Sequence, residues 1–475
     1  IQGLSATQIG AIATASLAGF ETRDLAALKS AQVAGFTTSQ VELLSSVQIA
    51  AFDSANLKGL STAQIAAIST SAIAGIETRD LVAMSATQVG AFKDTQLDQF
   101  DSRLLGAFTS AQLAGLTTSQ VNSLNSAQIQ ALTTSNLRGL SAAQVGAIDV
   151  GAIAGLESRD IPALSSAQVA GFTTSQIAAM SGAQVAALTS ANIAGLSSAQ
   201  VGAIATAAIS SMETRDLVAL STMQLSGMQS AQLDEFTATQ FDKLLTRQVA
   251  GLTSAQLSNF TSDQVAAFSS ANIQGLSDKQ IAFLSSGAFT GLEARDLAVL
   301  SSKQVSGLTT SQLAVISDVQ LAAFTTANIA GLSSAQVQSV ATAALSGFET
   351  RDLVALNSAE LVGLTDAQID ALTSNDKFGA LSAVQVASLS TAQIQGLDSA
   401  QVAAFTTANM KGLGSAQIRA FSATSIPGLE SRDIAALSSA QIAAFTTSQA
   451  ANFTSAQLAA LNSSNVVGLS SAQIG

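Results

Sequence analysis

Four residue types are absent from this chain of 475 residues: cysteine, histidine, tryptophan and tyrosine. Without imidazole and thiol groups, the chain lacks the commonest general bases, covalent nucleophiles and ligands for zinc and related metals. The absence of cysteine also excludes disulfide bonds, which leaves the redox compartment of the protein open. We therefore expect no enzymatic activity, no bound metal and no cofactor.

Charged residues are also few, at 11% of the chain, and the formal net charge is −12. Lysine and arginine form no patch, so the composition argues against binding to the phosphates of nucleic acid. Although 48% of the residues are hydrophobic, no run of 18 apolar residues occurs. We therefore expect a folded chain without a membrane span.

The most regular feature of the sequence is a large apolar residue at every eighth position. These anchors run from Leu4 to Leu372 and, after one additional residue, from Leu381 to Leu469, giving 59 octads that all begin with Leu, Ile, Phe, Met or Val. A short period maintained throughout is typical of a solenoid, in which each repeat packs against its neighbours. We expect residues 1–475 to form a single continuous repeat solenoid that is a segment of a longer chain.

The pattern inside each octad favours a short helix. Numbered from zero at the anchor, position five is a second apolar residue, position one is usually Ser or Thr, and position four is usually Gln. Apolar spacings of five and three do not keep one face of a strand inside, whereas Ser or Thr followed by Gln three residues later is a helix capping box. Thr37 with Gln40 and Ser197 with Gln200 are examples.

A continuous helix is excluded, because eight residues at about 100° each do not close on whole turns. We therefore predict an all-α solenoid of very short helices, one per octad and about five to seven residues long, with a β-solenoid as the alternative. The Gln at position four either completes the capping box or forms amide ladders between turns. Glycines at position seven, such as Gly59 and Gly331, are interpreted as flexible residues that end a helix and turn the chain. The residue inserted between Leu372 and Leu381 is expected in an exposed bulge.

Seven octads depart from the common pattern and read Glu-x-Arg-Asp. Successive copies are separated alternately by seven and by ten octads, and the last interval also contains the inserted residue. The alternation gives a super-repeat of seventeen octads, which is the distance from Glu21 to Glu157. Both spacings are close to whole turns of a solenoid with about 3.4 octads, or roughly 27 residues, per turn. We predict this turn length and, with it, a stripe of the motif along one side. The motif residues are Glu21, Arg23, Asp24, Glu77, Arg79, Asp80, Glu157, Arg159, Asp160, Glu213, Arg215, Asp216, Glu293, Arg295, Asp296, Glu349, Arg351, Asp352, Glu430, Arg432 and Asp433.

Two further changes at position four accompany the motif. The octad immediately before each copy has a small residue there, and the octad three before six of the copies has Asn. Such correlated changes suggest that the three octads meet in space, with the Asn beside the motif. The small residues are Ser16, Ala72, Ala152, Ala208, Ala288, Ala344 and Ser425, and the Asn residues are Asn56, Asn136, Asn192, Asn272, Asn328 and Asn409.

The motif has a chemical and a structural interpretation. Its carboxylates could serve catalysis or bind Ca²⁺, but the adjacent arginine repels a cation, and seven identical active sites without histidine or cysteine would be unusual. We favour a structural register motif, in which the arginine pairs with carboxylates and neighbouring carbonyls and the small residue of the preceding octad makes room for it. The dense Ser and Thr residues serve as helix caps, and O-glycosylation of them is an open alternative.

The octads have a recognisable counterpart. Strings such as Leu164-Ser-Ser-Ala-Gln-Val-Ala-Gly-Phe-Thr-Thr-Ser-Gln-Ile-Ala-Ala179 resemble the Thr-, Ala- and Gln-rich repeats of very large bacterial surface proteins, often described as related to adhesion or haem utilisation. The resemblance extends over the whole chain and implies a secreted, surface-attached or filament-forming protein. The residues do not support haem binding, because His, Cys and Tyr are absent and only six Met could serve as axial ligands.

We expect a structural extracellular protein, forming a rod that assembles into a filament, sheath or surface layer on a bacterial cell. The alternative is the repetitive stalk of a secreted adhesin whose binding domain lies outside this segment. An acidic mimic of nucleic acid is disfavoured, because the charges are too sparse. The expected partners are other copies of the same chain, with the cell envelope and glycans as further candidates, and with neither nucleic acid nor a membrane span.

Overall fold

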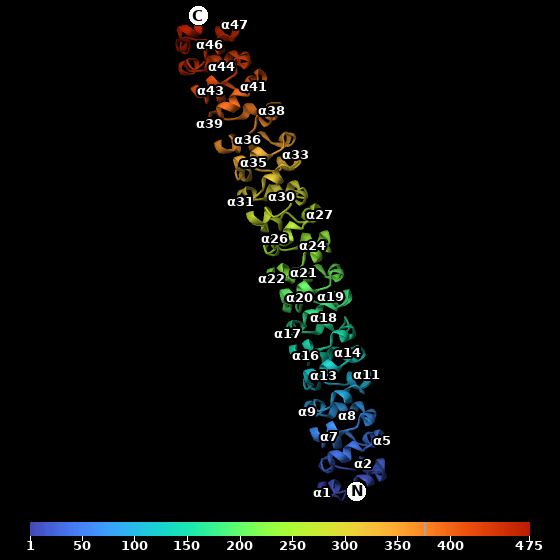
Figure 1. Cartoon of the computed structure of the whole chain (residues 1–475). Helices are drawn as coiled ribbons and strands as arrows, with labels where there is room; N and C mark the ends of the chain where they lie inside the picture. The colour runs from blue at the N-terminus through green and yellow to red at the C-terminus, as the bar shows by residue number, and fades with distance from the viewer. Residues whose placement is uncertain (375–376) are drawn as a thin grey trace. The chain divides into compact units, whose positions relative to one another are not determined.

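The computed structural model describes residues 1–374 and 377–475, and it consists of short helices joined by short connections (Figure 1). No β-strand occurs in this described part of the chain. The predicted all-α solenoid with one short helix per octad is therefore confirmed, and the β-solenoid alternative is wrong. The chain divides into two compact units, unit 1 (Ile1–Gln240) and unit 2 (Phe241–Gly475). The single continuous solenoid over residues 1–475 stays a prediction.

The α-helices of unit 1 are four to six residues long, slightly shorter than predicted. α24 (Ala238–Lys243) contains the point of division between the units. The others are α1 (Ala6–Gly10), α2 (Thr22–Ala26), α3 (Ser30–Val33), α4 (Thr38–Glu42), α5 (Ser46–Ala50), α6 (Ser54–Leu57), α7 (Thr62–Ala67), α8 (Thr78–Ala83), α9 (Ala86–Val89), α10 (Asp94–Leu97), α11 (Ser102–Gly106), α12 (Ser110–Ala114), α13 (Thr118–Ser123), α14 (Ser126–Ala131), α15 (Thr134–Leu137), α16 (Ala142–Ala147), α17 (Ser166–Ala170), α18 (Thr174–Ala178), α19 (Gly182–Ala186), α20 (Ser198–Ala203), α21 (Thr214–Ala219), α22 (Thr222–Ser226) and α23 (Ser230–Asp234).

The α-helices of unit 2 have the same lengths, except for the nine-residue α38. They are α25 (Thr246–Val249), α26 (Ser254–Ser258), α27 (Ser262–Ala266), α28 (Asp278–Ile281), α29 (Ser286–Phe289), α30 (Ala294–Val299), α31 (Ser302–Ser306), α32 (Thr310–Leu313), α33 (Asp318–Ala322), α34 (Thr326–Ile329), α35 (Ser334–Ser339), α36 (Thr350–Ala355), α37 (Ser358–Leu361), α38 (Asp366–Ser374), α39 (Ala383–Ser388), α40 (Thr391–Gln395), α41 (Ser399–Ala403), α42 (Thr407–Met410), α43 (Ser415–Ala420), α44 (Ser431–Ala436), α45 (Ser439–Ile442), α46 (Thr447–Ala450), α47 (Ser455–Ala459) and α48 (Ser471–Ile474).

Some octads form a 3₁₀-helix instead of an α-helix. In unit 1 these helices are η1 (Thr14–Gly19), η2 (Thr70–Gly75), η3 (Val150–Gly155), η4 (Ile161–Ala163), η5 (Ile193–Gly195) and η6 (Thr206–Ser211). In unit 2 they are η7 (Ile273–Gly275), η8 (Thr342–Gly347), η9 (Phe378–Ala380), η10 (Ala423–Gly428) and η11 (Val466–Gly468).

The glutamine at position four has both of the roles that the sequence left open. The backbone N–H of Thr37 donates to Gln40 Oε1 at 2.7 Å, and Thr37 Oγ1 accepts from the Gln40 N–H at 3.2 Å, which completes the capping box. The Nε2 of the same Gln40 donates to the carbonyl oxygens of Ile9, 31 residues earlier, and Ile12, 28 residues earlier, at 3.0 and 2.7 Å. One buried amide therefore caps its own helix and ties it to the previous turn.

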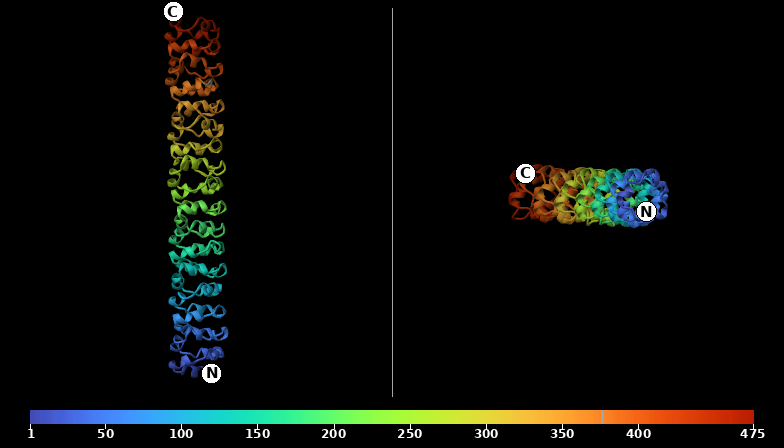
Figure 2. Two further views of the ribbon diagram at one scale, coloured as in Figure 1. Left: turned by 90° about the vertical axis from the view of Figure 1, so that its right-hand side faces the viewer. Right: turned by 90° about the horizontal axis from the view of Figure 1, so that it is seen from below.

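Unit 2 repeats this glutamine ladder. The Oε1 of Gln312 accepts from the Thr309 N–H, and its Nε2 donates to the carbonyls of Ile281 and Leu284 at 2.8 and 2.7 Å. These carbonyls lie at the junction of two octads, so each octad sits over the junction between the octads three and four before it. The turn therefore contains between three and four octads, in agreement with the predicted 3.4. Figure 2 shows the helices of each unit as stacked turns.

The apolar positions zero and five form the core of each unit. Val41 and Phe36 of one octad are buried, as are Leu313 and Leu308 in unit 2. Most phenylalanine anchors lie in this core, and several stack edge to face, such as Phe36 with Phe52 at 6.3 Å between ring centroids.

The glycines at position seven have a different role from the predicted one. A Cβ on Gly59 would lie 2.1 Å from the carbonyl oxygen of Ser30, and one on Gly331 would lie 2.0 Å from that of Ser302. Gly19, in the first turn of unit 1, has no such neighbour. These glycines are therefore needed because successive turns approach closely there, and the predicted need for backbone flexibility is not what distinguishes them.

The inserted residue in unit 2 is absorbed within one turn. Gln385 donates to Leu353 and Leu356, which lie 32 and 29 residues earlier instead of 31 and 28. Gln417 donates again across 31 and 28 residues. The ladder thus bonds the same octad positions on both sides of the insertion. The bulge predicted between Leu372 and Leu381 includes residues 375–376, which lie outside the described residues.

Within residues 1–374 and 377–475, no helix is long and apolar enough to cross a membrane.

Candidate functional site: the Glu-x-Arg-Asp octads

The motif changes two positions of the octad at once. Its Glu takes the N-cap position that Ser or Thr fills elsewhere, and its Asp takes position four, where other octads have Gln. In α8, Glu77 is the N-cap and makes no side-chain cap hydrogen bond, while Asp80 lies in the first turn. The capping box is thereby lost in this copy, whereas in the fifth copy Asp296 still accepts from the Glu293 N–H at 3.3 Å.

An exposed ion pair forms within every copy, between the Arg and the Glu two residues before it. The Arg side chains are 59–79% exposed and the Glu side chains 27–60%. The predicted pairing of the arginine with carboxylates is therefore present, but its side chain points outward and does not fill the space left by the small residue of the preceding octad. The pairs are Arg23 with Glu21 at 2.8 Å, Arg79 with Glu77 at 3.1 Å, Arg159 with Glu157, Arg215 with Glu213 at 2.9 Å, Arg295 with Glu293 at 2.9 Å, Arg351 with Glu349 at 3.0 Å and Arg432 with Glu430 at 2.5 Å.

The Asp is the buried member of the motif. From the second copy to the seventh its side chain is only 0–2% exposed, and the Arg Nε lies 3.5–4.0 Å from one of its oxygens. Among the described residues, neither carboxylate oxygen of Asp352 has a hydrogen-bond partner. Burial raises the pKa of Asp80, Asp216, Asp296 and Asp352 above its usual range, and the nearby Arg only partly offsets this effect.

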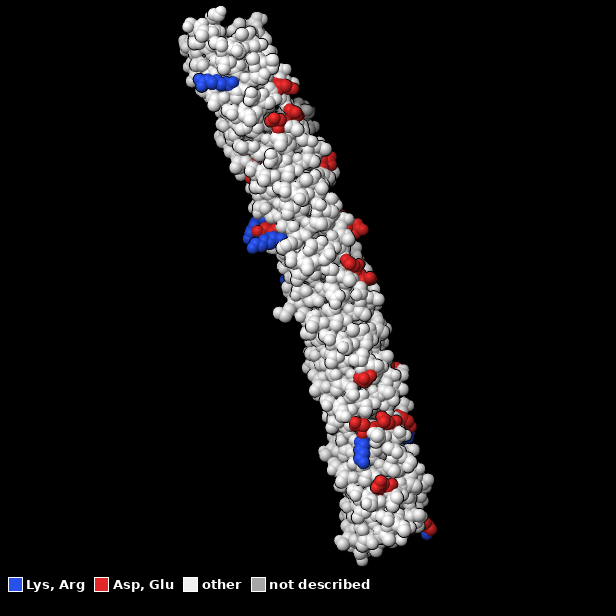
Figure 3. All heavy atoms as spheres, viewed as in Figure 1, with Lys and Arg blue, Asp and Glu red and all other residues white. Residues whose placement is uncertain are grey.

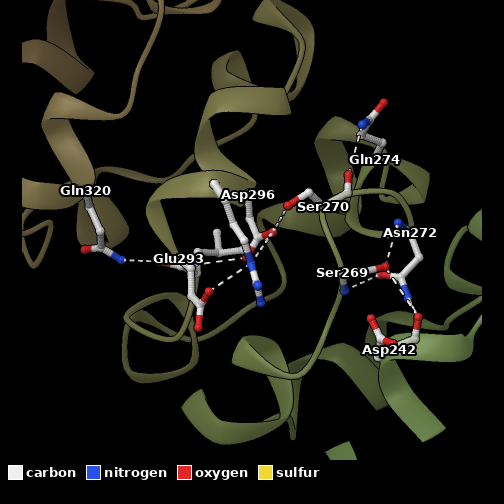
Figure 4. Close-up of polar contacts among 10 residues, drawn as sticks. Asp242, Ser269, Ser270, Asn272, Gln274, Glu293, Asp296 and Gln320 are labelled. Atoms are coloured by element: carbon white, nitrogen blue, oxygen red, sulfur yellow. Dashed lines mark hydrogen bonds and ion pairs between the residues drawn. The ribbon is translucent and has the colours of Figure 1, made fainter. Parts of the chain in front are cut away.

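The octad three before the motif supplies a hydroxyl to this Asp. Ser54 Oγ donates to Asp80 at 3.0 Å, and Ser270 Oγ donates to Asp296 at 2.8 Å, as Figure 4 shows. Thr407 with Asp433 and Thr134 with Asp160 repeat the contact. Each of these hydroxyls stands two residues before an Asn of position four. The predicted proximity of the Asn octads to the motif is therefore confirmed.

The Asn octads also connect motif copies that are seven octads apart. Asn56 Nδ2 donates to the carbonyl of Leu25 in the first copy, while Ser54 of the same octad reaches Asp80 in the second. Asn192 bonds in the same way to Ile161 of the third copy, and Asn328 to Leu297 of the fifth. Copies with this separation therefore lie two turns apart on the same side of their unit.

The octads with a small residue at position four form 3₁₀-helices. Without Gln they have no capping box, and they become η1, η2, η3, η6, η8 and η10, with Ala288 in α29 as the exception. Each packs against the helix three octads earlier where one exists, as η2 does against α5 and η8 against α33. The sequence signal was the missing Gln, which predicts the loss of the cap as well as extra space.

Shallow hollows recur beside the first, third and fourth copies in unit 1. They have equivalent linings: the anchor, the motif Glu, and the N-cap and Gln of the octad three places later. These three sets are Phe20, Glu21, Ser45 and Gln48; Leu156, Glu157, Ser181 and Gln184; and Met212, Glu213, Thr237 and Gln240. The motif therefore combines an exposed ion pair with a hollow beside it.

Among the described residues, no group of three or more acidic, His or Cys side chains is placed to hold a metal ion. Seven segments match the ALTTAQ repeat, at residues 17–54, 100–134, 153–190, 289–326, 343–376, 375–407 and 426–463, and together they cover just over half of the chain. The chain belongs to the ALTTAQ repeat family. Five of these ALTTAQ matches contain a Glu-x-Arg-Asp octad. No curated protein matches the chain.

Proposed function

We propose that this ALTTAQ repeat protein is a structural component of a bacterial cell surface, where copies of the chain assemble into a filament, sheath or surface layer. The observation that carries the proposal is the glutamine ladder, in which the same buried amide ties each turn to the previous one throughout both units. A fold that uses its polar side chains for internal hydrogen bonds in octad after octad suits a protein whose role is structural.

One feature of the composition supports a location outside the cell, and one feature of the structure supports a role without catalysis. A chain without cysteine carries no free thiol that could be oxidised there. Its conspicuous carboxylates are either buried, as Asp80 is, or paired with arginine, as Glu77 is. Neither arrangement offers an activated group to a substrate, so the proposal includes no enzymatic step and no cofactor.

The test is assembly, observed with purified protein and on cells. Light scattering and negative-stain electron microscopy over a range of concentrations should show polymers with a regular repeat. Antibody labelling of intact cells, followed by cryo-electron microscopy of the labelled material, should place the same polymer at the surface. A chain that remains monomeric at every concentration, with no polymer on cells, would contradict the proposal.

The alternative is the stalk of a secreted adhesin. The hollows in unit 1 are shallow, which favours this alternative. In a stalk the target is bound by a separate domain, so the repeats themselves need no deep binding site. Deleting the sequence that flanks residues 1–475 in the full protein distinguishes the two. A stalk loses attachment to its target after the deletion, whereas an assembling structural protein still forms its polymer.

A further inference from the structure

The four motif copies of unit 1 are spaced symmetrically along the chain. They begin at Glu21, Glu77, Glu157 and Glu213, with separations of seven, ten and seven octads, so the sequence of spacings is the same from either end. Successive turns of a solenoid are equivalent, so spacing along the chain becomes spacing along the solenoid. Because seven and ten octads are both close to whole turns at the predicted 3.4 octads per turn, we expect the four copies along one side of unit 1. A twofold axis at the middle of unit 1 then brings the first copy of one chain beside the fourth copy of another, and the second beside the third.

Each of these copies presents both charges to the outside. In unit 1 the Arg side chains are 63–79% exposed, and each lies against an exposed or partly exposed Glu of its own octad. A guanidinium group has five N–H donors, and the ion pair within the octad leaves donors for a second carboxylate. Two copies facing each other in opposite directions place the Arg of each chain beside the Glu of the other.

The surroundings of the motif favour contact with a second protein surface. On the face shown in Figure 3, charged side chains are few and gather in small groups that are separated by uncharged surface. Val82 follows the second copy and is 48% exposed. The hollows beside the first, third and fourth copies provide surface relief next to the charges.

We propose that unit 1 docks onto unit 1 of a second copy of this chain in antiparallel orientation, with the Arg and Glu of each motif copy pairing across the interface. This inference rests on the self-assembly proposed above and names its contact surface. A single exposed ion pair is weak, but four copies that engage together add up, because the first contact holds the others at high effective concentration. The three copies in unit 2 begin at Glu293, Glu349 and Glu430, and their two unequal spacings lack this symmetry.

Charge-reversal variants of the whole chain test the pairing. In the acidic variant Arg23, Arg79, Arg159 and Arg215 become Glu; in the basic variant the four Glu residues before them become Arg. Each variant alone should associate at least about tenfold more weakly than the natural chain, because like charges then face each other. An equimolar mixture should restore association to within about threefold of the natural chain, because opposite charges face each other again. The matched control places the same reversals in the three copies of unit 2 and should change this step less than about twofold.

Disulfide trapping tests the orientation, and the absence of natural cysteine makes each introduced thiol unique. Thr22→Cys and Thr214→Cys place thiols in the first and fourth copies. A mixture of these two chains should form the mixed disulfide on mild oxidation, and each chain alone should give little dimer. Ser175→Cys, about half a turn along the chain from Arg159, is the exposed control.

The outcomes separate this inference from the proposed function. If the natural chain does not associate at all, the proposed function and this inference both fail. If it associates and the acidic and basic variants associate equally well alone, the stripe is not the contact surface, although the structural role stands. A disulfide between two Thr22→Cys chains, without the mixed product, would overturn the antiparallel orientation.

Discussion

A glutamine octad and a Glu-x-Arg-Asp octad place different chemistry at the same buried position. Gln40 accepts one hydrogen bond from its own cap and donates two to the previous turn. Asp352 has no N–H to donate, and both its oxygens are buried without a hydrogen-bond partner among the described residues. The first arrangement donates two hydrogen bonds to the previous turn, whereas a motif Asp donates none, although Asp80 accepts one from Ser54. The motif octad presents an ion pair to the outside instead. The difference indicates that the common octads stabilise each unit and the motif octads mark its surface.

The largest expected effect comes from breaking the ladder. Gln393 accepts from the Ser390 N–H and donates to the carbonyls of Leu361 and Leu364, whereas Gln395, two residues later, is exposed. We expect Gln393→Ala to lower the free energy of local opening by about 3 kcal/mol, because three buried polar groups lose their partner. Hydrogen exchange of the amides in the two adjoining turns measures this. Gln395→Ala is the matched control, and equal protection in the two variants would refute the role of the ladder.

A smaller loss is expected where turns touch through glycine. Gly331→Ala would place a Cβ 2.0 Å from the Ser302 carbonyl oxygen, whereas a Cβ on Gly287 would meet only Ser285 Oγ at 3.8 Å. We expect Gly331→Ala to cost about 2 kcal/mol in local stability through forced separation of the turns. Gly287→Ala, within α29, should be neutral or slightly stabilising. If Gly331→Ala leaves local stability unchanged in the same exchange experiment, the two turns can accommodate a Cβ there and the close approach does not require glycine.

Replacing a buried Asp should increase local stability, in contrast to the two substitutions above. Burial raises the pKa of Asp352 from its usual 3.8, with Glu349 raising it further and Arg351 lowering it. The protonated form is therefore favoured in the folded chain, so the stability contributed by this group is full below about pH 3.8 and is lost as the pH rises through the raised pKa. We expect Asp352→Asn to stabilise its turns by about 1 kcal/mol at pH 7 and to have little effect at pH 3.5. Chemical denaturation of the natural chain and the variant, monitored by hydrogen exchange at the two pH values, provides the measurement. If the Asn variant is less stable than the natural chain at pH 7, the prediction is wrong.

The smallest effect on stability is expected at the exposed ion pair. Arg23 is 79% exposed and pairs with Glu21 at 2.8 Å, so Arg23→Ala should change local stability by less than about 0.5 kcal/mol. Thermal unfolding at low and high salt measures this small change. A loss comparable to that of Gln393→Ala would mean that the motif stabilises the turns, and the contrast between the two kinds of octad would disappear.

Much of the fold could be predicted from single octads, because their signals are local. The anchors gave the core, and Ser or Thr with Gln gave the short capped helices. The alternation of seven and ten octads correctly indicated the turn length and placed Asn56 beside the second motif copy, since Ser54 of the same octad reaches Asp80. These features depend only on spacing along the chain.

The remainder depended on how one turn meets the next, which no single octad reveals. The second role of Gln40 requires the carbonyl of Ile9 to lie above it, and the role of Gly59 requires the closeness of Ser30. The motif Arg was expected to occupy the space beside the small residue of the preceding octad, but a long charged side chain is more easily solvated than buried. The shorter Asp lies inside because position four is buried in most octads, although Gln8 and Ser16 in the first turn are exposed.

The offset of successive turns has a mechanical consequence within each unit. Each octad lies over the junction between two octads of the turn below, so the junctions of successive turns are staggered and do not lie directly above one another. A pulling force applied to one octad is shared by two below it through bonds such as those from Gln312 to Ile281 and Leu284. Separating two turns therefore requires the hydrogen bonds of several octads to break, because the bonds of each octad are divided between two octads of the turn below.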